Sequence, residues 1–226
     1  MKCLKDLLCD STWVRALSED DQARVHKDAY ELFIPVGGHA IRVGEPAQCW
    51  VGVIDGLLKM SVTRENGRHA TLTGVMPGGW AGEGSLLRED LWRYDGVAVR
   101  PTRIACVPLH TFRHLVATSL PFNHFLLSQL NARLSVFIGL AEIDRLLGPD
   151  ERVARCLANL FDPDLNPSSS RFVHLNQEEI GLLSAMSRQR ANEALHELER
   201  AGLLTVEFGG VTVLDLGGLR RYRRAD

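Results

Sequence analysis

The chain has 226 residues, of which 45% are hydrophobic and 24% charged, and its formal net charge is −2. These values are typical of a globular protein with one large or two modest domains, and they exclude nucleic-acid binding driven by overall positive charge. No apolar run reaches the length of a membrane span, and the N-terminus lacks a charged-then-apolar signal pattern. The sequence therefore predicts a cytoplasmic protein with no membrane partner.

Residues 30 to 110 contain many short strand-like segments separated by turn signals. The candidate strands are YELFIPV (30–36), HAIRV (39–43), WVGVI (50–54), LLKMSV (57–62), HATLTGV (69–75) and DGVAV (95–99). Between two of them, Asn66-Gly67 is typical of a tight type I′ hairpin turn. Closely spaced short strands of this kind predict a compact antiparallel β-roll or jelly-roll barrel.

From about Asn123 to Leu147 the pattern becomes that of a helix, which Gly148-Pro149 ends. Its apolar side chains are more numerous than one buried stripe requires: Phe125, Leu126, Leu130, Leu134, Phe137, Ile138, Leu140, Ala141 and Ile143. Either all of them pack on the barrel, or one face packs on the barrel and another on a second copy of the chain. We favour the second arrangement, in which this is a dimerisation helix.

A second domain is predicted to follow, with Asp150 capping its first helix. The stretch DPDLNPSSS from Asp162 is expected to be a loop within this domain. The RRYRR run from Arg220 either reaches DNA phosphates or is a solvated tail, and we favour the tail. Further helix signals begin at Asn176, a good N-cap residue with Glu179 three positions later, as in a capping box. A second helix is predicted over 187–200, starting at the N-cap residue Ser187.

The predicted 187–200 helix has an apolar stripe and an opposite polar face. The stripe consists of Ala191, Ala194, Leu195 and Leu198, and the residues predicted to contact DNA are Ser187, Arg188, Gln189, Arg190, Asn192, Glu193 and His196. Arginine pairs with guanine, glutamine or asparagine with adenine, and glutamate accepts from cytosine N4. A solvated amphipathic helix without a ligand is the simpler interpretation of such a face. The order of the surrounding elements decides between that interpretation and a DNA-binding helix.

That order is helix, short turn, helix and hairpin. The turn is Ser184-Ala185-Met186, in which a left-handed Ala185 costs roughly 1 kcal/mol. Gly202 ends the second helix, and LLTVEF and VTVL flank Gly209-Gly210, a two-residue hairpin signal. The combination predicts a winged helix-turn-helix, whose second helix enters the major groove of double-stranded DNA.

A barrel, a long helix and a winged helix-turn-helix, in that order, resemble the Crp/Fnr family of bacterial transcription regulators. Supporting motifs are Gly44-Glu45 with Ala47, Ile54-Asp55-Gly56, and the run from Pro77 to Glu83. The resemblance implies an α+β fold with an effector-sensing barrel (1–122), a dimerisation helix (123–148) and a DNA-binding domain (149–226). It also implies a homodimer on a palindromic DNA site, with RNA polymerase as a further partner.

In nucleotide-binding members of that family, a Gly-Glu pair opens a segment that ends in Arg-Ser or Arg-Thr and holds the ribose and the cyclic phosphate. Here Gly82-Glu83 opens the segment, but Arg93 is followed by Tyr94. Phe137 and Ile138 stand where the long helix would supply a Thr-Ser pair for the base. These replacements predict a degenerate pocket with Glu83 and Arg93 as a structural ion pair, and an effector other than cyclic AMP.

Other cofactors and functions find less support. The five cysteines are scattered, as in a reducing compartment: Cys3, Cys9 and Cys106 do not make an iron–sulfur quartet, and Cys49 and Cys156 lie in apolar contexts. His110 and His114 have a metal-capable spacing but no third ligand nearby. No phosphate loop or nucleophile elbow indicates an enzyme. The alternative is a nucleotide sensor whose winged helix docks a protein, and the effector and any cofactor stay unknown.

Overall fold

The computed structural model describes residues 2–63, 69–167 and 170–223, with side chains outside 141–146. Its N-terminal part is a β-roll of two four-stranded sheets with the orders β1-β8-β3-β6 and β2-β7-β4-β5. All the strand pairs in these two sheets are antiparallel. The strands are β1 (Tyr30–Ile34), β2 (His39–Ile41), β3 (Cys49–Asp55), β4 (Leu58–Thr63), β5 (His69–Val75), β6 (Trp80–Ala81), β7 (Asp95–Ala98) and β8 (Thr102–Pro108).

The predicted β-roll is confirmed, and each of the six predicted strands is present. The predicted Asn66-Gly67 turn lies outside the described residues. Strands β6 and β8 were not among the predicted strands. Strand β8 lies between β1 and β3 and is buried on both sides, so its sequence lacks the polar–apolar alternation of a half-exposed strand.

Five short helices cover one end of the β-roll or connect its strands: α1 (Leu4–Asp10), α2 (Thr12–Arg15), α3 (Glu19–Asp28), α4 (Glu83–Arg88) and α5 (Leu109–Thr118). The first four were not predicted. Helix α2 delivers Trp13 into an aromatic cluster, where its ring lies 5.1 Å from Trp50, 5.2 Å from Trp80 and 5.5 Å from Phe122. Helices α1 and α2 are therefore integral to the β-roll core.

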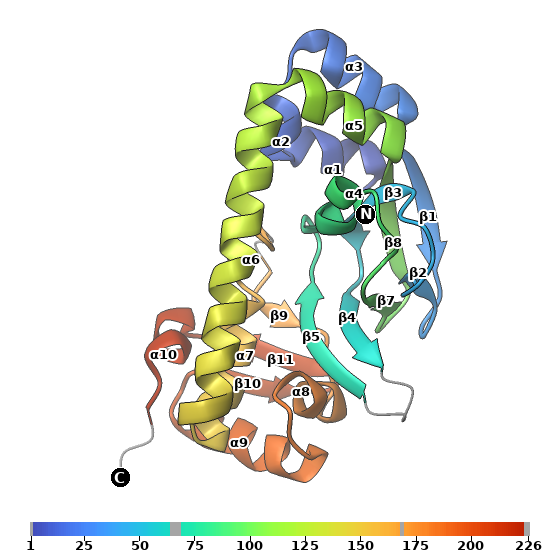
Figure 1. Cartoon of the computed structure of the whole chain (residues 1–226). Coiled ribbons are helices and arrows are strands. Elements are labelled where there is room, and N and C mark those ends of the chain that lie inside the picture. Colours follow the sequence, from blue (N-terminus) through green and yellow to red (C-terminus); the bar gives the residue numbers. More distant parts are fainter. Residues whose placement is uncertain (1, 64–68, 168–169, 224–226) are drawn as a thin grey trace.

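The long helix α6 (Leu120–Leu146) runs along the whole molecule and joins its two parts (Figure 1). It begins three residues before the predicted start, because the turn after α5 is short. Phe122 and Leu126 are buried against the β-roll. A second set of apolar side chains on α6 is exposed in the single chain: Leu120, Leu127, Leu130, Leu134, Phe137 and Ile138. The predicted contributions of Ala141 and Ile143 lie outside the described side chains.

The C-terminal domain consists of α7 (Pro149–Asn159), α8 (Gln177–Leu183), α9 (Arg188–Arg200), α10 (Leu216–Arg221) and a three-stranded sheet of order β10-β11-β9. Its strands are β9 (Phe172–Val173), β10 (Leu204–Glu207) and β11 (Gly210–Val213).

Two expectations for this domain were wrong. The N-cap of α7 is Gly148 rather than Asp150, because Glu151 accepts the Gly148 N–H at 3.0 Å. The RRYRR run begins inside α10, where Leu219 anchors the helix in the core.

The C-terminal domain packs against the open end of the β-roll. Leu57 and Met76 of the β-roll belong to the hydrophobic core of this domain, and α8 lies against β5. The Asn166 side-chain oxygen accepts the backbone N–H of Met76 at 2.8 Å. Within the described part of the chain, none of the helices is long and apolar enough to cross a membrane.

Candidate nucleic-acid interface and effector pocket

Helix α8 begins where the sequence predicts, with a complete capping box. Asn176 accepts the Glu179 backbone N–H at 2.9 Å, and the Glu179 carboxylate accepts the Asn176 N–H at 3.1 Å. Burial is the main cause that raises the pKa of Glu179. The box fixes the first turn of α8, and therefore the direction in which α8 presents α9.

The turn between α8 and α9 uses the left-handed residue that the sequence predicts. Ala185 has φ +53°. The Met186 N–H donates to the carbonyl of Gly181 at 2.9 Å, and a Cβ at Gly181 would lie 2.9 Å from the Met186 carbonyl oxygen. Gly181, inside α8, therefore lets the turn fold closely over the helix.

Helix α9 is the predicted recognition helix, and its orientation is fixed from one side. The Ser187 hydroxyl caps it by accepting the Arg190 N–H at 3.3 Å. The predicted stripe of Ala191, Ala194, Leu195 and Leu198 is fully buried. The opposite face is therefore presented outward, with Ser187, Arg188, Gln189, Glu193 and His196 exposed.

The polar side chains of this face differ in how they are held. Arg190 pairs with Glu193 at 2.6 Å, and Gln189 donates to the same carboxylate at 3.3 Å. The hydrogen bond from Arg190 is the first cause that keeps the pKa of Glu193 below its usual value. His196 lies 3.5 Å from Glu199. Among the described residues, Arg188 makes no hydrogen bond or ion pair, so its guanidinium is free for a ligand.

Asn192 is tied to the neighbouring helix. Its side-chain oxygen accepts from Gln177 of α8 at 2.6 Å. Gln177 was not among the residues predicted to contact DNA. Its signal in the sequence is a polar residue at the start of the first helix of a helix-turn-helix. A base contact that uses the Asn192 oxygen would share this acceptor with Gln177, whereas the Asn192 side-chain NH2 group can still donate.

The wing differs from the predicted hairpin by one position. Glu207 pairs with Gly210, so the two-residue turn is Phe208-Gly209 and not Gly209-Gly210. Gly209 has φ +80°, and a Cβ at Gly210 would lie 2.2 Å from the Val173 carbonyl oxygen. Gly210 is thus required for the approach of β11 to β9. As a consequence, the Phe208 side chain is fully exposed at the tip of the wing.

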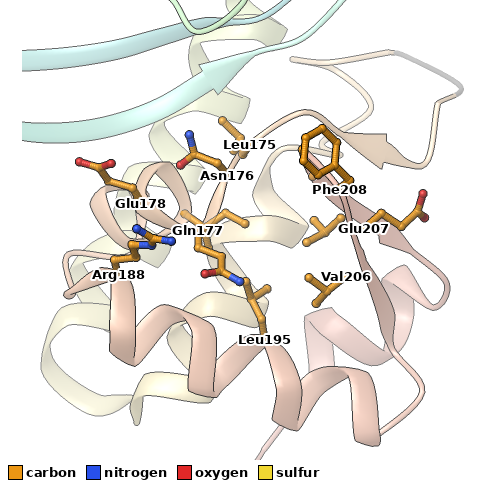
Figure 2. A pocket seen from close by; sticks show the side chains of 13 residues that line it. Leu175, Asn176, Gln177, Glu178, Arg188, Leu195, Val206, Glu207 and Phe208 are labelled. Carbon is orange, nitrogen blue, oxygen red and sulfur yellow. The ribbon is translucent and has the colours of Figure 1, made fainter.

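A groove of about 420 Å³ lies between the wing, the start of α8 and the inner side of α9. Figure 2 shows Arg188 and Glu178 on one side of it and Glu207 and Phe208 on the other, with Gln177 between them. Arg188 is the one cation among its lining residues. Two carboxylates, Glu178 and Glu207, also line the groove, so positive charge is confined to Arg188 at the start of α9 and the groove is not a broad basic surface.

Glu83 forms a buried ion pair, but its partner is Arg133 of α6. The Arg133 guanidinium donates to Glu83 and to the carbonyl of Trp80, and the Trp50 indole N–H donates to Glu83 at 3.4 Å. The two side chains are 3% and 14% exposed. Burial alone would lower the pKa of Arg133. The Glu83 carboxylate and Tyr94 outweigh the effect of burial, so the pKa of Arg133 is raised.

The predicted Glu83–Arg93 ion pair is wrong. Arg93 is exposed and binds Asp90 at 2.6 Å, three residues earlier in the same loop. The resemblance to the family's nucleotide-binding segment favoured Arg93, whereas the fold brings Arg133 to Glu83 from fifty positions away. No sequence signal beyond an arginine on a mostly apolar helix distinguished Arg133.

Gly82 and Tyr94 complete the cluster around Glu83. Gly82 has φ +105°, and a Cβ there would lie 2.7 Å from the Trp92 ring. Burial, followed by the nearby Glu83 carboxylate, raises the pKa of Tyr94 well above its usual value, so the phenol stays neutral. The structure therefore brings Gly82, Glu83 and Tyr94 together, and leaves Arg93 outside.

The residues present do not fit a cyclic nucleotide. Glu83 is already paired, Arg93 is bound elsewhere, and the space that Phe137 lines with Arg133 and Trp80 holds about 10 Å³. A cavity needs about 10–15 Å³ of such space to hold a single water molecule, so a nucleotide does not fit. Ile138 is 61% exposed and contributes nothing to this space.

The histidines and cysteines have structural neighbours. His114 lies 2.9 Å from Asp21 and His110 3.3 Å from Asp28, which joins α5 to α3. The described residues contain no group of three or more side chains arranged to hold a metal ion. Cys156 and Cys106 are buried, and Cys49 is half-buried beside Cys106.

The fold and the site together define a two-domain DNA-binding regulator with a cyclic-nucleotide-binding type of β-roll. Residues 33–119 match the cyclic nucleotide-binding domain, and residues 151–222 match the Crp-like helix-turn-helix domain. The chain belongs to the Crp/Fnr family of transcription regulators.

Named relatives agree with this assignment. Over 180 residues the chain is 26% identical to the transcriptional regulator LdrP of Thermus thermophilus, with 79% of this chain and 89% of that protein covered. It is 26% identical over 180 residues to the cAMP-activated global transcriptional regulator CRP of Pasteurella multocida, with 78% and 85% covered. The solved structure of FixK2 from Bradyrhizobium japonicum has the same fold, with a TM-score of 0.72, 17% identity, and 88% and 98% covered.

Proposed function

We propose that this Crp/Fnr regulator acts in the cytoplasm as a homodimer that binds an inverted-repeat DNA site, with α9 in the major groove of each half-site. The boundaries 1–122, 123–148 and 149–226 then separate sensor, dimerisation helix and DNA-binding domain. The observation that carries the proposal is the free guanidinium of Arg188 on the first turn of a rigidly packed helix. RNA polymerase is the proposed partner of the DNA-bound dimer.

The exposed apolar set on α6 supports the dimer. Leu127, Leu134 and Ile138 are each more than half exposed in the single chain. Six large apolar side chains along one helix form a continuous stripe that a second copy of the helix would cover. Pairing through α6 would also place two copies of α9 in a twofold arrangement, as an inverted repeat requires.

Removing the Arg188 side chain is expected to weaken DNA binding and to relax its specificity. If Arg188 reads guanine through two hydrogen bonds, Arg188→Ala costs about 1–3 kcal/mol per half-site and removes preference at one base pair. The measurement compares affinities for single-base variants of the preferred site. Arg200→Ala is the matched control, because Arg200 lies at the far end of α9 and pairs with Glu197. Unchanged base preference in Arg188→Ala would remove Arg188 from the base-reading set.

Cyclic AMP and cyclic GMP are expected to bind no more tightly than the millimolar range. Each hydrogen bond that a buried polar group loses costs about 1–3 kcal/mol, and two such losses shift a micromolar site toward millimolar. Isothermal titration calorimetry on the full chain measures this directly. Micromolar binding of either nucleotide would contradict the interpretation of the pocket as degenerate and would favour the nucleotide sensor.

One observation favours the alternative of a sensor that docks a protein through its winged helix. Phe208 is a fully exposed aromatic residue beside the groove, and aromatic side chains are common anchors of protein interfaces. Phe208→Ala separates the two proposals. If the wing docks a protein, Phe208→Ala should abolish binding of that partner. If the wing belongs to a DNA-binding domain, Phe208→Ala should retain the base preference that depends on Arg188.

A further inference from the structure

One hydrogen bond joins the first residue of α8 to the polar face of α9. The Gln177 side-chain nitrogen donates to the Asn192 side-chain oxygen at 2.6 Å, across a separation of 15 positions in the sequence. Figure 2 shows the Gln177 side chain extending from the start of α8 towards α9. Both residues are partly exposed, so the pair lies at the surface of the DNA-binding domain and is accessible to a ligand.

The backbone at each end of this bond is held in place. Gln177 directly follows Asn176, whose capping box with Glu179 fixes the first turn of α8. Asn192 directly follows Ala191, which is fully buried in the core of the domain. Because neither backbone is free to move, the bond determines how the Asn192 amide group is turned.

The direction of the bond decides which end of the Asn192 amide is presented to a ligand. Its oxygen accepts from Gln177 and is therefore directed towards α8. The oxygen and the nitrogen lie on opposite branches of a planar amide, so the NH2 group is directed away from α8. In a helix-turn-helix the first helix crosses the DNA backbone while the second lies in the major groove. The NH2 group is thus the end of the amide that is directed at the bases.

The surrounding side chains leave two hydrogen-bond donors on this part of α9. The Glu193 carboxylate is engaged within the helix, where it accepts from Arg190 at 2.6 Å and from Gln189 at 3.3 Å. Arg188 lies one turn before Asn192 on the same side of the helix. In the part of the chain that the structure describes, neither the Arg188 guanidinium nor the Asn192 NH2 group has a hydrogen-bond partner. The two groups form a row of donors along α9.

The four bases differ in whether they offer an acceptor or a donor beside such a group. In the major groove guanine O6 and thymine O4 are keto acceptors, whereas adenine N6 and cytosine N4 are amino donors. An isolated asparagine pairs with adenine by using its oxygen and its NH2 group together. With its oxygen held by Gln177, Asn192 offers its NH2 group, which fits a keto oxygen and is opposed by the donor of an amino base.

We propose that Gln177 is a positioning residue for DNA recognition, which fixes Asn192 as a hydrogen-bond donor and thereby selects guanine or thymine at the base that Asn192 faces. This selection replaces the adenine expected for an isolated asparagine. The proposal rests on the proposed DNA-binding function, because it names the bases that one position of that site accepts. Gln177 needs no base contact of its own for this role.

The first test is the base preference of the full-length wild type. In sites selected from random DNA, the base pair that Asn192 faces is the one whose preference disappears in Asn192→Ala. Affinities are then measured for the four bases at this position, changed symmetrically in both half-sites. Guanine or thymine should be bound about fivefold or more tightly per half-site than adenine or cytosine. A preference for adenine or cytosine, or no preference that depends on Asn192, would overturn the proposal.

Gln177→Glu tests the positioning role in a way that a merely structural residue would not pass. An ionised carboxylate can only accept, so it would draw the Asn192 NH2 group towards α8 and turn the oxygen towards the bases. The preference should therefore invert to adenine or cytosine, again by about fivefold. Uniform weakening by the added negative charge cancels, because the measured quantity is a ratio of affinities. An unchanged preference for guanine or thymine would contradict the positioning role.

Two further variants, verified as folded by circular dichroism, serve as controls. Gln177→Glu combined with Asn192→Ala carries the same added charge without the amide, and it should show no preference at this position. Gln177→Ala releases the amide and should lose the preference for guanine or thymine, because a free asparagine also pairs with adenine. An inverted preference that persists without the Asn192 amide would assign the effect to the new carboxylate and overturn the proposal.

The hydrogen bond itself is measured without DNA. A double-mutant cycle of Gln177→Ala and Asn192→Ala should give a coupling of about two- to tenfold in the unfolding equilibrium constant. Absence of coupling would refute the bond on which the proposal depends. If the wild type selects no specific DNA, the proposed function fails and base selection fails with it. A specific site whose base preference is indifferent to Gln177 would refute the positioning role alone.

Discussion

Replacing Arg133 by methionine is expected to lower the free energy of unfolding by about 3–5 kcal/mol at fixed protein concentration, because Glu83 would be left buried without its cation. Denaturant titration monitored by tryptophan fluorescence measures the loss, since Trp50 and Trp80 both contact the pair. Arg93→Met is the matched control. It removes an arginine from an exposed ion pair with Asp90, for which about 0–1 kcal/mol is expected.

The double variant Glu83→Met with Arg133→Met should recover most of this loss, because apolar side chains of similar volume can replace a buried ion pair at little cost. The coupling free energy from the four proteins isolates the interaction. Equal losses in Arg133→Met and Arg93→Met would contradict the assignment of Arg133 as the partner of Glu83.

Glutamate at both Leu134 and Ile138 is expected to convert the dimer to a monomer. Both side chains are more than half exposed in the single chain, so the change should not disturb the β-roll core. In a dimer, four carboxylates would face each other in an apolar interface. Sedimentation velocity at micromolar concentration should then give a monomer, and affinity for the full DNA site should fall about 100-fold or more because only one half-site is engaged.

Ser135→Glu is the control for this experiment, since it adds the same charge at an exposed position beside the apolar stripe. A double Glu variant that sediments as an unchanged dimer would rule out α6 as the dimer interface. Monomers with full DNA affinity would instead refute the need for two recognition helices.

The elements that the sequence predicts well are those with local signals. The capping residues Asn176 and Ser187 fix the starts of α8 and α9, and each makes the expected backbone hydrogen bond. The buried stripe of α9 follows directly from its apolar spacing. Even the strained Ala185 follows, because the short turn between two such helices requires a left-handed residue.

Apart from the N-cap of α7, which a neighbouring residue decides, the main errors concern features that depend on distant parts of the chain. The ion-pair partner of Glu83 comes from α6, and Gly210, predicted in the wing turn, belongs instead to strand β11, where it lies close to β9. Contacts between segments that are distant in the sequence leave no local pattern from which they could be predicted.

The measurement that tests the central claim most directly is selection of sites by the full-length protein from a pool of random double-stranded DNA. It is run with and without a small-molecule extract of the source cells, so that an effector is present in one arm. We expect enrichment of an inverted repeat whose half-site centres lie about one helical turn, or roughly 10 base pairs, apart. Failure to enrich any inverted repeat in both arms would contradict the account of this protein as a dimeric DNA-binding regulator.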